Sequence, residues 1–289
     1  MINTRTKSVR SIDRAISILK CFSLHRLELS GAEVAQEVGL SVTTAHRILS
    51  CLSKGGFVTR NERTLKYTVG PEIYRIGNLF MFSLDLTRIA EPVVKLLNEM
   101  TGEVVNVAIR NEDVIFILLR EESKFPIALR LYAGTTLPAH ATSLGKALLS
   151  ELSADELDKV YPSNTLSRLT DKTITDKANL KRELDSIRRT GLAFSREETH
   201  EGSMAVATLI RNAAGKAIAA LSIGVPIYRM SIQKESILSQ LVIMAADLIS
   251  YRLGYQVKPN TITDSEALVT WWNKSKLQIF KENETVLRQ

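Results

Sequence analysis

The chain has 289 residues, of which 45% are hydrophobic and 24% charged, so it has the composition of a soluble globular protein with room for two domains. No apolar run approaches the roughly 18 residues that a membrane span needs, and the basic N-terminus lacks the apolar segment of a signal peptide. We therefore expect a cytoplasmic chain with no membrane partner. The net charge of +7 is uneven, because residues 1–80 hold 12 Lys and Arg against 6 Asp and Glu, whereas residues 81–289 hold 26 against 25. Positive charge confined to one segment is typical of a module that binds phosphates.

Residues 30–52 predict two short helices joined by a tight turn. Ser30 is suited to cap the first helix, and Glu33 completes a capping-box pattern. Gly39 ends that helix, since a residue without Cβ adopts a left-handed backbone at no cost, and Ser41 caps the second helix. The apolar side of the second helix is expected to consist of Val42, Ala45, Ile48, Leu49 and Leu52.

The polar side of the second helix carries hydroxyl, imidazole and guanidinium groups, which read base edges and phosphates when a helix lies in the DNA major groove. Residues 57–69 follow directly and read as a β-hairpin with a polar tip, the wing of a winged helix-turn-helix. Two amphipathic helices with a glycine turn also occur in folds that bind no DNA, where such a polar face is only solvated; the hairpin favours DNA binding. The candidate DNA-binding residues are Ser41, Thr43, Thr44, His46 and Arg47 on the helix, with Arg63 and Lys66 on the wing.

Helical spacing continues over residues 72–100, which predict a linker helix with a break near Ser83. Exposed apolar residues on such a connector are most simply buried against a second copy of the chain. The remainder mixes strand and helix patterns in an order that indicates an α+β domain, with an antiparallel sheet flanked by helices. Strands are expected at residues 104–109, 114–119, 127–131, 205–210 and 216–223, a loop at 134–138, and helices at 140–150, 153–160, 178–189 and 232–253.

Three ordered blocks of sequence carry a resemblance to a known family. Together they resemble the IclR family of bacterial transcription regulators. The first block is the N-terminal segment with the predicted helix-turn-helix. The second is LPAHATSLGKALL at residues 137–149, and the third is GLAFSREE with AALSIGVPIYR within residues 191–229. The resemblance implies an N-terminal winged helix for operator DNA and a C-terminal domain related to GAF folds that binds a small effector. It also implies dimers, often paired into tetramers, on palindromic or pseudopalindromic operators.

The resemblance also implies positions for an effector pocket. Serine hydroxyls there can donate to a carboxylate, the helix after His140 can add backbone N–H groups at its first turn, and leucines would form an apolar wall. In the alternative interpretation these serines are ordinary strand and cap residues. The family often has cysteine and proline where Ala205 and Leu209 stand, and an acidic residue where Ser195 stands, so the ligand's identity stays open. The pocket positions carried over by motif are Leu129, Ser143, Leu144, Ser195, Ser203, Ala205, Ser222 and Gly224.

These patterns predict a DNA-binding transcription regulator, repressor or activator, that a small organic acid switches. Its partners would be double-stranded operator DNA, the effector and further copies of itself, as a dimer or tetramer. The alternative is a small-molecule enzyme with a DNA-binding head, but no nucleophile elbow, phosphate-binding loop or metal-spaced cluster stands in the sequence, so we expect no catalytic residue, metal or cofactor. Cys21 and Cys51 are expected to be buried, reduced thiols. The expected domains are residues 1–71 for the winged helix, 72–100 for the linker helix, 101–256 for effector binding, and 257–289 for an extension of unknown role.

Overall fold

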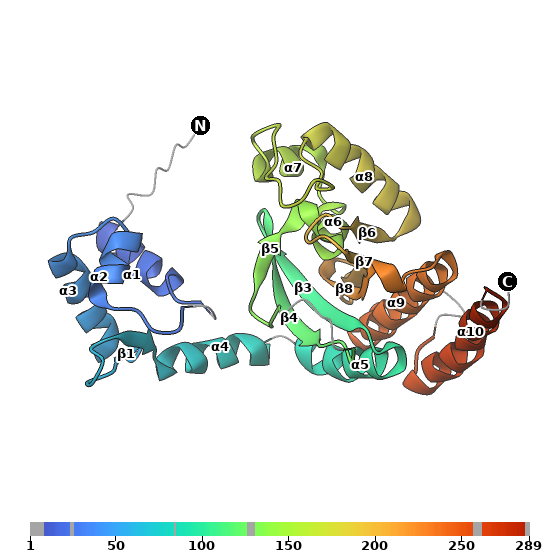
Figure 1. The fold of residues 1–289 in the computed structure, drawn as a ribbon, viewed down its shortest axis with the longest axis horizontal. Coiled ribbons are helices and arrows are strands. Elements are labelled where there is room, and N and C mark those ends of the chain that lie inside the picture. The colour runs from blue at the N-terminus through green and yellow to red at the C-terminus, as the bar shows by residue number, and fades with distance from the viewer. Residues whose placement is uncertain (1–8, 24–25, 84, 126–130, 257–261, 287–289) are drawn as a thin grey trace. The chain divides into compact units, whose positions relative to one another are not determined.

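The computed structural model describes residues 9–23, 26–83, 85–125, 131–256 and 262–286 (Figure 1). The chain divides into two compact units, Met1–Leu84 and Asp85–Gln289. Among the described residues, none of the helices is both long and apolar enough to cross a membrane.

The first unit is a three-helix head followed by a hairpin and a further helix. Its core consists of apolar side chains from the three helices and the hairpin, with Ile18, Val34 and Leu49 fully buried. The hairpin pairs antiparallel, with Val58 opposite Val69. In chain order the elements are α1 (Arg10–Lys20), α2 (Gly31–Glu37), α3 (Val42–Lys54), β1 (Val58–Arg60), β2 (Tyr67–Val69) and α4 (Pro71–Ser83).

Local capping chemistry sets the ends of α2 and α3. The Glu33 N–H donates to Ser30 Oγ at 3.2 Å, and the Ser30 N–H donates to Glu33 Oε2 at 2.7 Å, which confirms the predicted capping box. Gly39 has φ of +64°, and the Ser41 hydroxyl accepts the Thr44 N–H at 3.3 Å. The predicted helix-turn-helix and wing are therefore present.

The connector consists of two helices rather than one. Helix α4 ends at Ser83 and belongs to the first unit, whereas α5 (Asp85–Thr101) belongs to the second. Most of the apolar stripe of α5 is already buried within its own unit, with Ala90, Val93 and Leu97 at 1% exposure or less. The exposed apolar side chains of the connector are thus those of α4, where Tyr74 is 75% and Ile76 42% exposed.

The second unit is built on one antiparallel sheet, in the order β5-β4-β3-β8-β7-β6. Helices α5 and α9 pack against one face, and α6 packs against the other, where α7 and α8 lie beyond it (Figure 1). The elements are β3 (Val104–Asn111), β4 (Val114–Glu121), β5 (Thr136–Pro138), α6 (Ser143–Leu149), α7 (Ala154–Val160), α8 (Lys177–Thr190), β6 (Ala193–Arg196), β7 (Ser203–Arg211), β8 (Ala217–Pro226), α9 (Ile232–Arg252) and α10 (Ser265–Val286).

Three expectations from the sequence need correction, two in this unit and one in the first unit. The segment expected to be a loop at residues 134–138 contains edge strand β5, which pairs with β4. The helix expected from His140 begins at Ser143, because Ala139–Ala141 form a 3-10 turn and Thr142 is the N-cap. Cys51 is exposed, whereas Cys21 is buried as expected. Most of the strand expected at residues 127–131 lies outside the described residues.

Helix α10 lies in the extension at residues 257–289, for which the sequence predicts no role. It packs against α9 and α5, and Leu268 is completely buried there. Trp271 and Trp272 are half-buried. The extension is therefore part of the second unit's helical layer.

Gly145 generates a prediction about stability. A Cβ on Gly145 would stand 2.1 Å from the Ala139 carbonyl oxygen, so α6 lies against the preceding turn without room for a methyl group. Gly145→Ala should lower the free energy of unfolding by about 1–3 kcal/mol in urea titrations. Gly77→Ala in α4, where no atom stands within 4 Å, is the matched control and should be neutral or stabilising. Equal effects of the two changes would contradict the packing argument.

Candidate functional sites

The exposed start of α3 is the first candidate site. Ser41, Thr43 and Arg47 are exposed, while Thr44 is half-buried and its hydroxyl lies 2.8 Å from Ser41 Oγ. Val42 was expected on the apolar side but is 49% exposed, since the core residues of α3 begin one turn later at Ala45. The start of the helix is therefore an accessible surface of hydroxyls with one guanidinium.

His46 is exposed but has contacts within the head. A Cβ on Gly31 would stand 2.5 Å from Cε1 of His46, so the imidazole lies on the first turn of α2. His46 Nδ1 lies 3.4 Å from the Tyr67 hydroxyl, and the Arg60 guanidinium stands 5.8 Å from the Tyr67 ring centroid. His46 thus joins α2, α3 and the wing, a role that the sequence did not indicate.

The tip of the wing is held by an asparagine. Asn61 Oδ1 accepts the N–H groups of Arg63 and Thr64 at 2.9 and 3.1 Å, and Leu65 takes a left-handed conformation with φ of +57°. Arg63 is exposed and Lys66 is half-buried. Within the described part of the chain, neither cation forms an ion pair, so both remain available to phosphates.

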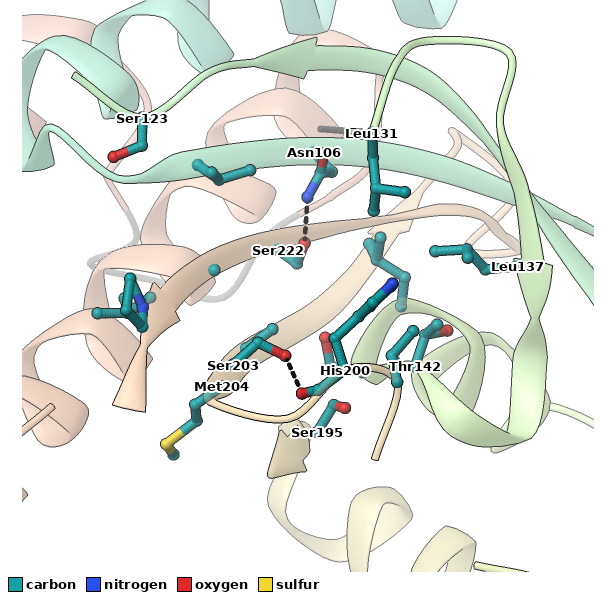
Figure 2. Close-up of a pocket in the computed structure, with 18 of the residues that line it drawn as sticks. Asn106, Ser123, Leu131, Leu137, Thr142, Ser195, His200, Ser203, Met204 and Ser222 are labelled. Carbon is teal, nitrogen blue, oxygen red and sulfur yellow. Dashed lines mark hydrogen bonds between the residues drawn. The ribbon is translucent and has the colours of Figure 1, made fainter. Parts of the chain in front are cut away.

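The second candidate site is a cavity of about 390 Å³ between α6, the sheet and the β6–β7 loop (Figure 2). Leu129 lies outside the described residues, so nothing can be said of its place. The other positions carried over by motif all line this one cavity, although whether they bind an effector stays a prediction. They are Ser143, Leu144, Ser195, Ser203, Ala205, Ser222 and Gly224.

Strand register explains why these residues meet. On the α6 side of the sheet, Gly224 lies opposite Val104 on one strand and Ala205 on the other, and Ala205 lies opposite Ser195. The neighbouring row places Ser222 beside Asn106, and Asn106 beside Arg120. The floor of the cavity is therefore two adjacent cross-strand rows.

Several cavity residues were missed by the sequence reasoning. Asn106 and Arg120 lie on β3 and β4, and Thr142, Thr199 and His200 lie around the helix start and the β6–β7 loop. A β-bulge between Val107 and Ala108 shifts the pairing with β4, so strict alternation along β4 does not place its residues correctly. No local signal in the sequence marks that bulge.

Two of the predicted hydroxyls are already engaged as donors. Ser195 Oγ donates to the Ala141 carbonyl at 3.2 Å. Ser203 Oγ donates to the His200 carbonyl at 2.6 Å (Figure 2). A hydroxyl has a single proton to donate, so in this arrangement these two serines offer a ligand only lone pairs. The expectation that all four serines donate therefore needs correction.

The β6–β7 loop, residues 197–202, is anchored from several sides. The Lys146 ammonium is 1% exposed and lies 2.7 Å from Glu198 and 3.1 Å from Glu183. Thr173 Oγ1 donates to the Glu198 carbonyl, and Thr199 Oγ1 donates to that of Ala141. Burial raises the pKa of the Glu198 carboxyl, and the Lys146 charge opposes that rise. These bonds place the loop over the cavity.

His140 is structural rather than part of a nucleophile pair. Its Nε2 lies 2.9 Å from the Ser167 carbonyl oxygen, and its ring packs edge-on against Tyr161 with centroids 5.9 Å apart. The side chain is 2% exposed and does not line the cavity. The Nε2 atom is therefore committed to the backbone and is not a base for Ser143.

A winged helix-turn-helix and a cavity-bearing α+β unit in one chain define the class of DNA-binding regulators with a sensory domain. Two family models match: the IclR helix-turn-helix domain at residues 11–62, and the bacterial transcriptional regulator IclR C-terminal domain at residues 80–251. The chain belongs to the IclR family of bacterial transcriptional regulators, as its motifs suggested.

Relatives and solved structures agree with this assignment. The chain is 35% identical to the HTH-type transcriptional regulator BhcR of Paracoccus denitrificans, over 85% of this chain and 88% of the relative. It is similar to the crystal structure of Thermotoga maritima IclR, with 26% identity, a TM-score of 0.67, and coverage of 86% and 100%. An IclR homolog from Microbacterium hydrocarbonoxydans, crystallised with 4-hydroxybenzoate, shares the fold, with 22% identity, a TM-score of 0.75, and coverage of 84% and 98%.

The buried His140 predicts a pH dependence of stability. Burial lowers the pKa of His140 below its ordinary value of 6.5, so the unfolded chain binds more protons than the folded one as the pH falls below about 6.5. The free energy of unfolding should therefore be highest above that pH and decrease below it. His140→Gln should flatten the decrease between about pH 7.5 and 5.5, measured by urea unfolding. A part will remain, because burial also lowers the pKa of His200. An unchanged slope would contradict this account.

Proposed function

We propose that this chain is a ligand-responsive transcription regulator, which binds a palindromic operator as a dimer or tetramer and is switched by a small organic acid. It would act where the chromosome lies, in the cytoplasm. The observation that carries the proposal is that one chain combines an accessible recognition helix and wing with a 390 Å³ cavity provided with hydrogen-bond donors. This combination supports a switch in which ligand binding at the cavity alters DNA binding.

On DNA, the start of α3 enters the major groove. The hydroxyls of Ser41, Thr43 and Thr44 face base edges, while Arg47 and the wing cations Arg63 and Lys66 hold phosphates and set the register. His46 reads bases only with the part of its ring that Gly31 and Tyr67 leave accessible. The support is the exposure of these groups on one helix start and one hairpin tip.

In the cavity, the acid lies at the first turn of α6. The Thr142 carbonyl accepts the Lys146 N–H, and the Thr142 hydroxyl accepts the Gly145 N–H. Because the first N–H groups of a helix have no acceptor within it, α6 itself offers none to the N–H groups of Ser143 and Leu144. These two donors, with the dipole of the helix, favour a carboxylate. Apolar side chains complete the enclosure. The IclR homolog that was crystallised with 4-hydroxybenzoate supports an effector that is a small acid.

A second copy of the chain would cover the exposed apolar residues of the head. Ile12 and Ile16 stand one turn apart on α1, and Tyr74 and Ile76 are exposed on α4. Two heads joined in this way reach half-sites one helical turn, about 34 Å, apart on DNA. An acid that prefers one arrangement of the heads by about 1–3 kcal/mol would change operator affinity about 5- to 150-fold.

The function is tested by footprinting the full-length protein on the DNA upstream of its own gene, with a panel of small carboxylic and aromatic acids. We expect protection of a palindrome that at least one acid alters. Conversion of an acid without any effect on DNA binding would instead indicate an enzyme with a DNA-binding head.

Removal of the Arg47 guanidinium should weaken binding to every duplex. Arg47→Ala loses one phosphate contact, so affinity should fall about tenfold, and the slope of log affinity against log salt should decrease by about 0.9. Fluorescence anisotropy over a salt series measures both. Arg182→Ala, which removes the same charge from exposed α8, should change neither value. An unchanged affinity for Arg47→Ala would refute the groove assignment.

Filling the cavity should uncouple it from DNA. Ser222 is 1% exposed in the floor of the cavity, so Ser222→Leu should abolish the response to acid while operator affinity stays within about twofold. Gel shifts with and without acid measure both. Ser163→Leu, at an exposed loop position, should respond as the unaltered chain does. A preserved response in Ser222→Leu would mean that the effector binds elsewhere.

A further inference from the structure

We propose that Asn106 is a specificity-determining residue of the cavity: its side-chain amide donates a hydrogen bond to the effector, which is therefore an acid with a second oxygen acceptor remote from its first carboxylate. This inference rests on the proposed function and deepens it. The acceptor would be a hydroxyl, keto or second carboxylate oxygen.

The first support is a polar row across three strands. Arg120, Asn106 and Ser222 lie side by side on β4, β3 and β8, on the face of the sheet that forms the cavity floor. Arg120 Nη1 donates to Asn106 Oδ1 at 2.9 Å. Asn106 Nδ2 donates to Ser222 Oγ at 3.5 Å (Figure 2). All three side chains are almost buried, and all three line the cavity.

The second support is the orientation of the Asn106 amide. A guanidinium carries only N–H donors, so the atom that faces Arg120 has to be the amide oxygen. Arg120 is itself fixed, because its Nε and Nη2 donate to both oxygens of Glu122, at 2.6 and 3.1 Å. The Asn106 nitrogen is thereby turned toward Ser222 and the cavity.

The third support is a count of donors. The Asn106 nitrogen carries two hydrogens, and among the described residues its one partner is Ser222, at the long limit of a hydrogen bond. Since Ser222 Oγ accepts from Asn106, its own proton is available to a ligand. On β6 and β7 of the same sheet, Ser195 and Ser203 already donate to backbone carbonyls. Among the asparagine and serine side chains on this face of the sheet, Asn106 and Ser222 therefore keep a donor for a ligand.

The arrangement gives the ligand two polar ends. Helix α6 packs on this face of the sheet, and its residues Ser143 and Leu144 line the same cavity as the Asn106 row. Under the proposed function, the first carboxylate of the acid lies at Ser143 and Leu144. Apolar side chains of Ile115, Leu137 and Leu144 line the space as well. An acid with an apolar middle and an oxygen at its far end satisfies both sides, whereas a simple monocarboxylate leaves the amide without an acceptor.

The test uses the full chain with two matched pairs of acids, 4-hydroxybenzoate with benzoate and succinate with butyrate, in calorimetric titrations. In the unaltered protein, the oxygen-bearing member of at least one pair should bind about tenfold more tightly than its partner. Absence of discrimination in both pairs, with any of the acids bound, would overturn the inference and leave the proposed function intact. Failure of all four acids to bind would overturn both.

Asn106→Asp is the decisive variant. An aspartate still accepts the Arg120 N–H but has no donor and brings a negative charge to the cavity, so the preferred acid should bind at least about tenfold more weakly and the preference should vanish. A far-ultraviolet circular dichroism spectrum and a cooperative thermal transition, both recorded without ligand, separate loss of recognition from misfolding. Asn212→Asp is the control, since its Oδ1 accepts backbone N–H groups in an exposed turn. Unchanged acid binding in Asn106→Asp would overturn the assignment.

Discussion

The sensory unit depends on the ion pairs that the buried Lys146 ammonium forms with Glu198 and Glu183. Lys146 lies on α6, Glu198 in the β6–β7 loop and Glu183 on α8, so three separate elements share one charge. Taking two charges out of water costs free energy, so a buried ion pair adds little net stability. Removing one of the two partners leaves the other charge buried and unpaired, so the pair holds its elements in a fixed geometry. The cavity donors are attached to the same elements. Ser143 and Leu144 precede Lys146 by less than one helical turn, and Thr199 and His200 follow Glu198 directly.

The recognition unit follows a different principle, because short-range contacts hold it together. The capping box at Ser30, the turn at Gly39 and the cap at Ser41 are each made within a few residues. His46 and Tyr67 then attach the wing to the helices. The head is thus built largely from local contacts, whereas the second unit joins strands and loops from distant parts of the sequence.

This difference explains what could be predicted from the sequence. The helix-turn-helix and the wing consist of local patterns and could be predicted from them. Seven residues that line the cavity were named in advance from the motifs of the family, because no local pattern in the sequence indicates them. Asn106 and Arg120 were missed, because their positions depend on which strands pair and on the bulge after Val107. Asn106 is 14 residues from Arg120 and 116 residues from Ser222 along the chain. The direction of the Ser195 and Ser203 protons also depends on carbonyls that only the folded loop supplies. Strand β5 is three residues long, too short for a periodic signal.

Helix α10 has a consequence for assembly. It lies beyond residue 251, where the family match ends, yet it packs on α5 and α9 and buries Leu268 completely. The outer layer of this sheet is therefore one helix thicker than the core that the family shares. The area of α5 and α9 that lies under α10 is closed to other molecules, so a molecule that binds this layer contacts α10 itself or the helix surface that α10 leaves open.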